Sequence, residues 1–280
     1  MNHTATVFPP EATKPGRSLD IATPRLLPAN RLEHLLPGLV TGFSTALAPL
    51  GDEALAPAVR GLLARRLGQG PDSVPLPTLL KQTHSTAILA LSDAPGGAAL
   101  PLRPAPVYDG FTAIGTRQGI AAIKTADCVP LLAVDAEIEA YGALHVGWRG
   151  AAAGILPKLL GGWRQAGSSL SRTVLVLGPH IQACCYRVRA DCLERFSPRD
   201  LDGAIVRRGK APHLDLGTVL RTQAARFGIS GQRLLRWHQC TYCHRGREGS
   251  FPYASYRRAR QEGSAEVGTN VALIGFVEAG

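Results

Sequence analysis

The chain has 280 residues, 45% of them hydrophobic, which is typical of a globular protein with a substantial core. Its 31 Lys and Arg residues against 21 Asp and Glu give a formal charge of +10, which favours acidic partners such as phosphorylated small molecules. The basic residues are scattered rather than interleaved with aromatics, which argues against nucleic-acid binding, and no apolar run approaches the ~20 residues that cross a membrane.

Residues 1–27 are rich in Pro, Thr and charge without periodicity, so we predict a flexible N-terminal tail. They contain no apolar stretch of signal-peptide length. Six cysteines in a chain of this length do not make a disulfide scaffold and fit a reducing compartment. We therefore expect a cytoplasmic protein with one catalytic domain over residues 28–280, as a monomer or small homo-oligomer.

The first ordered element after the tail is an amphipathic helix within residues 53–68, which Gly68 ends. An extended, proline-interrupted run follows at 73–85. Beyond Gly119 the sequence contains several short apolar strands and two further helices. We expect strands at 119–124, 129–135, 141–147, 173–178 and 270–277, and helices at 150–166 and 214–228. Because strands and helices do not alternate regularly, we predict a single α+β domain with a mixed β-sheet core flanked by helices.

Cys128 immediately precedes the predicted strand 129–135, and His145 lies near the end of the next predicted strand, 141–147. If these strands pair as antiparallel neighbours, the two side chains meet at one edge of the sheet. Three interpretations are open at this point. Both residues could be ordinary core residues, His145 could deprotonate Cys128 as a nucleophile, or both could be zinc ligands.

The zinc interpretation needs a third ligand, and His84 in "LLKQTHSTAI" is the candidate. Three protein ligands with one open position form a catalytic zinc site. Spacing alone does not establish that His84 reaches the other two residues.

Five motifs carry a resemblance to a known family. In order they are "KQTHS", "TADCVPLL", "HVGWRGAAAGIL", "LGPHIQACCYRV" and "CTYCHRGREGSFPYASYRR". Together they resemble the YfiH-like laccase-domain (polyphenol oxidoreductase) family, whose members are regarded as zinc-dependent purine nucleoside phosphorylases with additional adenosine deaminase activity. The resemblance covers about Gly42 to Phe276. It implies a YfiH/CNF1-like fold, a purine nucleoside and phosphate as substrates, and His84, Cys128 and His145 as the metal ligands.

The same resemblance suggests roles for residues beside these ligands. Arg149 is the candidate for holding phosphate or substrate, with pairing to Asp127 as the alternative. Asp127 is expected to orient a ligand or act as acid or base. Tyr186, Arg257 and Arg258 are expected to bind substrate. Copper is the less favoured metal, because the eight histidines contain no His-x-His pair.

The remaining cysteines offer a weaker signal. Cys184 and Cys185 are adjacent, which disfavours a bond between them, and we interpret them as packing or pocket-lining residues. Cys240-x-x-Cys243 resembles half of a zinc knuckle. Because a structural zinc site needs a second pair and the sequence has no other C-x-x-C, a second zinc is not expected.

Four positions depart from the family pattern: Ala46, Ala113, Arg187 and Thr269. We expect them at the periphery of the pocket, where a change could remove turnover. Two alternatives to a phosphorylase stay open. One is a metal-free hydrolase that uses Cys128 and His145. The other is a zinc-containing protein that binds nucleosides without turnover.

Overall fold

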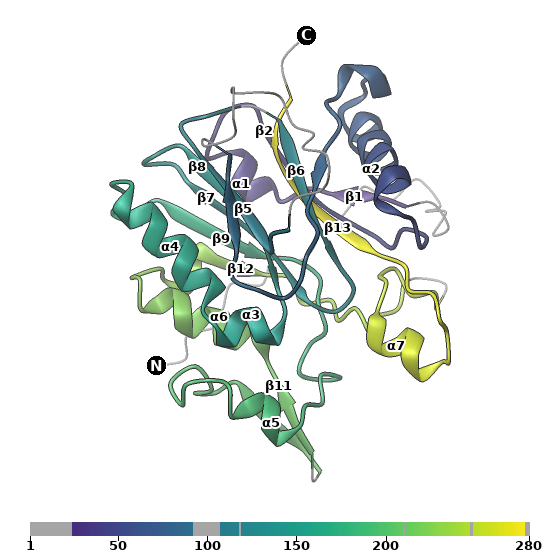
Figure 1. Cartoon of the computed structure of the whole chain (residues 1–280), viewed down its shortest axis with the longest axis vertical. Coiled ribbons are helices and arrows are strands. Elements are labelled where there is room, and N and C mark those ends of the chain that lie inside the picture. The colour runs from purple at the N-terminus through teal and green to yellow at the C-terminus, as the bar shows by residue number, and fades with distance from the viewer. Residues whose placement is uncertain (1–23, 92–106, 118, 210, 247–248, 278–280) are drawn as a thin grey trace.

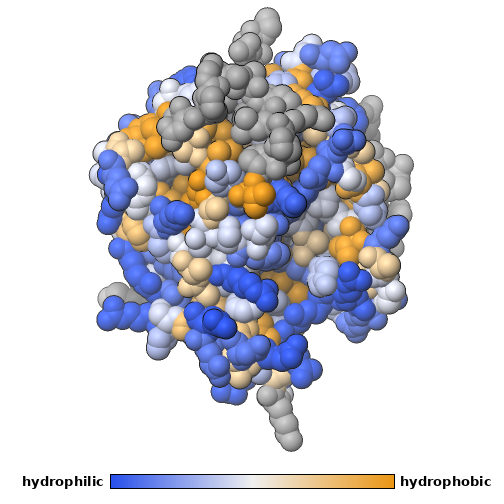
Figure 2. Space-filling view, in the orientation of Figure 1, coloured by the Kyte–Doolittle hydropathy of each residue, from blue (hydrophilic) through white to orange (hydrophobic). Residues whose placement is uncertain are grey.

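The structure is a computed structural model, and it describes residues 24–91, 107–117, 119–209, 211–246 and 249–277. Of the predicted N-terminal tail, residues 1–23 lie outside the described residues. No helix of the described ranges is long and apolar enough to cross a membrane. The face drawn in Figure 2 is mainly hydrophilic, with hydrophobic residues in small groups between the charged ones.

Two mixed sheets form the centre of the molecule. The five-stranded sheet has the order β1 (Leu26–Leu27), β2 (Leu39–Ser44), β13 (Asn270–Phe276), β6 (Ile120–Thr125) and β3 (Thr78–Leu79). The six-stranded sheet has the order β12 (Leu234–Arg236), β9 (Thr173–Leu177), β7 (Val129–Asp135), β8 (Ala140–Val146), β5 (Gly110–Ile114) and β4 (Ile88–Ala90). A separate hairpin pairs β10 (Ile205–Arg208) with β11 (Ala211–Leu214).

The two sheets stack and are covered by helices on their outer faces (Figure 1). Strand β7 shows why, because its successive side chains point to opposite faces and both faces are buried. Leu131 and Ala133 join the core beneath α4 (Ile155–Gln165) and α6 (Leu216–Ala225). Leu132 and Val134 join the core between the sheets, while α2 (Asp52–Leu67) packs on the far side of the five-stranded sheet. The predicted α+β fold is confirmed, with its strands divided between two sheets.

One predicted helix is wrong in its extent. Residues 150–166 were expected to form a single helix, but the chain forms α3 (Trp148–Ala152) and then α4. Gly154 separates them with a left-handed φ of 81°, a conformation that glycine adopts without steric cost. The helix that Gly68 ends and the helix ended near Gly228 are confirmed as α2 and α6.

The remaining helical segments are short. Those whose bounds lie within the described residues include α1 (Asn30–Glu33), α5 (Ala190–Leu193), α7 (Tyr256–Gln261) and the 3-10 turns at Pro71–Ser73 and Gly231–Arg233. Both α5 and α7 lie towards the lower end of the molecule in Figure 1, below the sheets. They follow long loops that leave the six-stranded sheet.

Strand register gathers many chain segments at one edge of the six-stranded sheet. The predicted antiparallel pairing of β7 and β8 is confirmed, with Pro130 opposite His145. The start of β5 lies at this edge because Gly110 pairs with Leu144, and the end of β9 does so because Leu177 pairs with Leu131. Strand β12 runs parallel to β9 and ends beside it. Loops from five strands therefore meet where Cys128 and His145 lie.

Candidate metal centre

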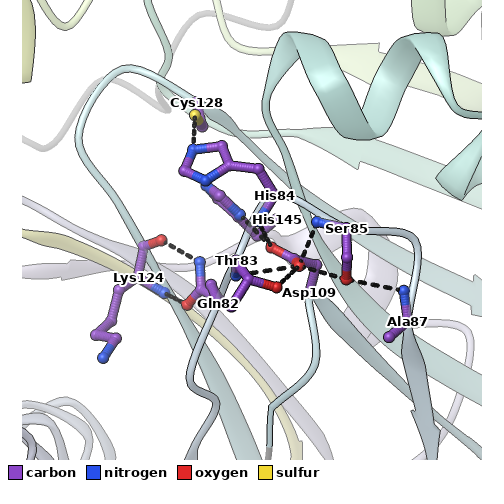
Figure 3. A network of polar contacts seen from close by, with 9 residues as sticks. All are labelled: Gln82, Thr83, His84, Ser85, Ala87, Asp109, Lys124, Cys128 and His145. Atoms are coloured by element: carbon purple, nitrogen blue, oxygen red, sulfur yellow. Dashed lines mark hydrogen bonds and ion pairs between the residues drawn. The ribbon is translucent and has the colours of Figure 1, made fainter.

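His84, Cys128 and His145 come together at this edge of the sheet. One ligand atom from each lies within 4.8 Å of the other two, and the His84 Nε2 is 3.7 Å from the Cys128 Sγ. The two imidazole rings meet edge to face with centroids 4.8 Å apart. In Figure 3 the His84 ring points toward the sulfur of Cys128, while His145 turns toward Asp109. The geometry of the predicted trio is that of a site that could hold a metal.

Asp109 is the buried carboxylate that organises two of the three ligands. Its Oδ1 accepts a hydrogen bond from the His145 Nδ1 at 2.9 Å and another from the His84 backbone amide at 2.9 Å. Its Oδ2 accepts from the amide of Ser85 at 2.6 Å and its hydroxyl at 2.7 Å, and from the amide of Thr83 at 3.2 Å. Since the Nδ1 of His145 is occupied, its Nε2 is left for a metal, which is the usual carboxylate–histidine–metal arrangement.

Backbone strain marks the same place. His84 has a φ of 63° and Asp127, beside Cys128, has a φ of 91°, both in the left-handed region that non-glycine residues rarely occupy. Such conformations persist when surrounding bonds hold them, as the Asp109 carboxylate holds the amides of residues 83–85 (Figure 3). The strain is what directs the His84 side chain over Cys128.

Gly147 leaves the room that the ligands need. A Cβ at this position would lie 2.7 Å from the His84 Cδ2 and 3.1 Å from the Cys128 Sγ. The backbone of Gly147 is extended, with φ −79° and ψ 171°, so any residue could adopt its conformation. The glycine is required by the close approach of two ligands and not by the turn itself.

The electrostatics suit a cation. Burial and the neighbouring His145 and Arg149 lower the pKa of His84, despite the opposing charge of Asp109, which favours a neutral imidazole. Burial, with added repulsion from Asp127 and Asp109, raises the pKa of the Cys128 thiol to about 12. Burial opposes ionisation of Asp109, but its hydrogen bonds from His145 and Ser85 prevail and hold its pKa well below the usual range. Cys128 therefore needs a positive partner to become a thiolate at neutral pH.

The carboxylate of Asp127 is held by the segment after β12. Its Oδ1 accepts a hydrogen bond from the Thr241 hydroxyl and its Oδ2 one from the Arg257 amide, both at 2.7 Å. Arg149 instead stacks on the ring of Trp148, with its guanidinium carbon 4.4 Å from the ring centroid. The alternative in which Arg149 pairs with Asp127 is therefore wrong.

A cleft beside the trio collects three of the predicted substrate residues. Arg149, Tyr186 and Arg257 line it, and the guanidinium of Arg257 lies 5.4 Å from the centre of the Tyr186 ring. Its other lining residues include Arg187, Arg189 and a single acid, Asp191. The cleft is thus rich in guanidinium groups, which bind phosphate and carboxylate in a planar, two-pronged way.

Arg258 lies elsewhere. Its Nη1 donates to the carbonyls of Thr241 and Tyr242, each at 2.8 Å, and its Nη2 to that of Tyr253 at 2.6 Å. The structure does not bring it together with Arg149, Tyr186 and Arg257. Its guanidinium also covers the ring of Phe251, so it serves as an internal brace for this loop.

The four departures from the family pattern are dispersed. Only Arg187 lines the arginine-rich cleft. Ala113 is buried in the core between the sheets, whereas Ala46 and Thr269 lie at the backbone contacts that join residues 46–47 to residues 252 and 269. The expectation that all four flank the pocket holds for one.

Sequence reasoning missed Asp109 and Gly147. Asp109 is the first residue of "DGFTA" and immediately precedes β5, and Gly147 immediately precedes the first helical residue, Trp148. A carboxylate at the start of a buried strand was the available signal. Its hydrogen-bond partners are 24–36 residues away, so spacing could not reveal them.

Two stacked mixed sheets with helices on both outer faces, and two histidines and a cysteine gathered at a sheet edge, define an α+β protein with a candidate metal centre. The chain belongs to the multi-copper polyphenol oxidoreductase laccase family, whose model matches residues 51–277.

Relatives and solved structures agree with this membership. A purine nucleoside phosphorylase of Bacteroides thetaiotaomicron is 32% identical over 190 residues, 65% of this chain and 69% of the relative. Adenosine deaminase RL5, from an unknown prokaryotic organism, is 29% identical over 69% of this chain and 75% of its own length. The YfiH protein of Bacillus licheniformis has the same fold, with a TM-score of 0.74 and 23% identity over 91% of this chain and 98% of that one. YlmD from Geobacillus stearothermophilus matches with a TM-score of 0.67 and 26% identity over 87% and 94%.

Proposed function

We propose that this protein is a zinc-dependent purine nucleoside phosphorylase, with adenosine deamination as an additional activity. It would convert adenosine, inosine or methylthioadenosine and phosphate into the free base and the corresponding ribose 1-phosphate. The observation that carries the proposal is a three-ligand metal set together with an arginine-lined cleft, one of whose lining residues, Arg149, acts electrostatically on the ligand His84. The names of the relatives, phosphorylase and adenosine deaminase, support it.

His84, Cys128 and His145 would hold the metal. One thiolate and two imidazoles suit zinc, and three protein ligands leave a position for substrate. A zinc ion bound there would supply a Lewis acid that polarises a substrate oxygen. The space above Gly147 and the orientation of His145 by Asp109 are what fit the protein to such an ion.

The arginines of the cleft are assigned to phosphate. In phosphorolysis a phosphate oxygen forms a bond to the sugar C1′ while the bond from C1′ to the base nitrogen breaks. The electron pair of that bond goes to the base, which then takes up a proton. Arg149 and Arg257 would hold the phosphate and offset its charge, and stacking on Trp148 and Tyr186 keeps their planes fixed.

We assign Asp127 to positioning and not to proton transfer. Both of its oxygens accept hydrogen bonds from the segment after β12, one from Thr241 in the loop and one from Arg257 at the start of α7. Because Asp127 immediately precedes Cys128, these hydrogen bonds link the segment after β12 to the loop that carries Cys128. The effect of Asp127 on substrate would pass through Arg257, whose Nη1 also donates to the Arg187 carbonyl at 2.9 Å.

The two alternatives have less support. A metal-free hydrolase needs a Cys128 thiolate, whereas burial raises the pKa of this thiol to about 12 and the mechanism leaves His84 without a role. A protein that only binds nucleosides was suggested by the four departures, of which only Arg187 lines the cleft.

The test is an assay of inosine and adenosine with and without phosphate, using wild type and Arg149→Gln. We expect phosphate-dependent release of base by the wild type. The variant should show a KM for phosphate about 10- to 100-fold higher, since a hydrogen bond to a charged group contributes roughly 1.5–3 kcal/mol. Arg221→Gln is the matched control, because Arg221 is an exposed arginine that does not line the cleft. Base release that is independent of phosphate, or absent, would rule out the phosphorylase.

A further inference from the structure

A second group of potential metal ligands lies apart from the first. The Sγ atoms of Cys184, Cys185, Cys240 and Cys243 all lie within 4.8 Å of one another, and those of Cys184 and Cys243 are 3.7 Å apart. All four are free thiols. They come from two chain segments that are more than 50 residues apart in the sequence.

The sheet explains why these segments meet. Strands β9 and β12 are parallel neighbours, so the loops that follow them leave from the same edge. An isolated parallel bridge joins His180 to Cys240 beyond the strand ends. The amide of Gln182 then donates to the Cys240 Sγ at 3.4 Å, which places the Cys184–Cys185 pair over the Cys240–Cys243 turn.

The spacing of the sulfurs is that of a tetrathiolate site. Tetrahedral zinc with Zn–S distances of about 2.3 Å holds its sulfurs roughly 3.8 Å apart. The 3.7 Å between Cys184 and Cys243 matches this edge, and the 4.8 Å limit of the group leaves only a small contraction on binding. Four thiolates are also the ligand set that fills all four positions of zinc and leaves none for substrate.

Packing does not account for the group. A cysteine that serves as a small hydrophobic residue is buried, but Cys243 is exposed and both Cys184 and Cys185 are only partly buried. A bond between the adjacent pair is disfavoured by geometry, because consecutive Cα atoms are closer than a disulfide prefers. The earlier interpretation of Cys184 and Cys185 as packing residues is therefore replaced.

The turn between Cys240 and Cys243 is held from outside by a cation. Arg258 donates to the carbonyls of Thr241 and Tyr242, the two residues between these cysteines. The guanidinium thus fixes the C-x-x-C turn and places a positive charge near a group that would carry a net charge of −2, one zinc ion with four thiolates. The role of Arg258 in this proposal is to hold the Cys240–Cys243 turn, and not to bind substrate.

We propose that Cys184, Cys185, Cys240 and Cys243 form a second, structural zinc site that fastens the loop after β9 to the loop after β12. The first loop carries Tyr186, and the second leads to Arg257. Binding replaces four thiol protons by one metal ion. The inference does not depend on the proposed phosphorylase activity.

Zinc content of purified variants tests the site. Wild type loaded with Zn²⁺ and freed of excess should hold two ions per chain, and Cys128→Ala one. Cys184→Ser and Cys243→Ser should each lose the other ion and keep the one bound near Cys128. Cys192→Ser is the control, because Cys192 is a cysteine outside the group and should leave both ions in place. A Cys128→Ala protein without bound zinc, or Cys184→Ser and Cys243→Ser proteins that hold as much zinc as the wild type, would overturn the proposal.

X-ray absorption spectroscopy keeps the test decisive if the serine variants do not fold. Cys128→Ala leaves only the second site, so its zinc should have four sulfur neighbours and no nitrogen. Mixed nitrogen and sulfur coordination would contradict the site. So would disulfides among these four cysteines in the purified, unreduced protein.

Discussion

At the scale of single residues, Asp109 and Gly147 decide whether three side chains can act as one site. Asp109 fixes the ring of His145 and the backbone of His84, and Gly147 leaves the space in which His84 approaches Cys128. Neither residue would be a ligand. Both act on the geometry of the ligands, and such outer contacts are typically worth 10- to 100-fold in metal affinity.

Gly147→Ala should weaken zinc binding at the first site about 10- to 100-fold while the protein stays folded. The added methyl would lie 2.7 Å from the Cδ2 of His84 and 3.1 Å from the Sγ of Cys128, so these two ligands must shift from their present approach. A chelator competition titration measures the affinity. Gly161→Ala is the matched control, because nothing lies within 4 Å of a Cβ at that glycine. Equal zinc affinity in the two variants would show that the space above Gly147 is not needed.

The sequence identified the three candidate ligands that the structure brings together, but not the residues that position them. Cys128 and His145 followed from antiparallel pairing of adjacent strands, and His84 from the search for a third ligand, which the family resemblance then supported. The site needs the left-handed backbone of His84 and a carboxylate 36 residues from His145. Those contacts are tertiary, so no local pattern records them.

At the scale of elements, the loops after β9 and β12 connect both cysteine-containing sites to the cleft. Thr241 lies between Cys240 and Cys243 in sequence, and its hydroxyl donates to Asp127, the neighbour of Cys128. Arg257, from the same C-terminal segment, donates its amide to the other oxygen of Asp127. Asp127 therefore joins the segment after β12 to the loop that carries Cys128.

Thr241→Val should lower the free energy of unfolding by about 1–3 kcal/mol, because it leaves a buried carboxylate oxygen without its donor. It should also raise the KM for phosphate, since Arg257 shares that carboxylate. Denaturant unfolding and steady-state kinetics measure the two effects. Thr241→Ser keeps the hydroxyl and should resemble the wild type. Identical behaviour of the valine and serine variants would exclude this connection.

Helices and strands were predicted well where the apolar periodicity is strong, and poorly where a single glycine ends a helix. The central strands and helices α2 and α6 were expected near their observed positions. The helix over 150–166 was not divided in advance, because the apolar pattern continues through Gly154. Likewise, the Cys184–Cys185 pair completes a four-cysteine group only through the parallel contact of β9 and β12.

At the scale of the whole molecule, the stacking of two sheets gathers the candidate metal ligands where strands of the six-stranded sheet begin and end. Sequence periodicity shows that a strand is buried on both faces, but it does not distinguish a helix from a second sheet as the covering layer. The alternating side chains of β7 contact helices on one face and the other sheet on the opposite face. Stacking leaves the strand ends as the exposed positions, and both groups of candidate metal ligands lie beyond strand ends.

Restoring activity with zinc tests most directly whether the His84–Cys128–His145 site drives phosphorolysis. Protein stripped of metal is titrated with Zn²⁺ while phosphate-dependent release of base from inosine is measured, for wild type and Cys128→Ala in parallel. Wild type should regain activity as zinc fills the site, whereas Cys128→Ala should stay inactive at every zinc concentration. Full activity of metal-free wild type, or of Cys128→Ala, would contradict a zinc-dependent phosphorylase.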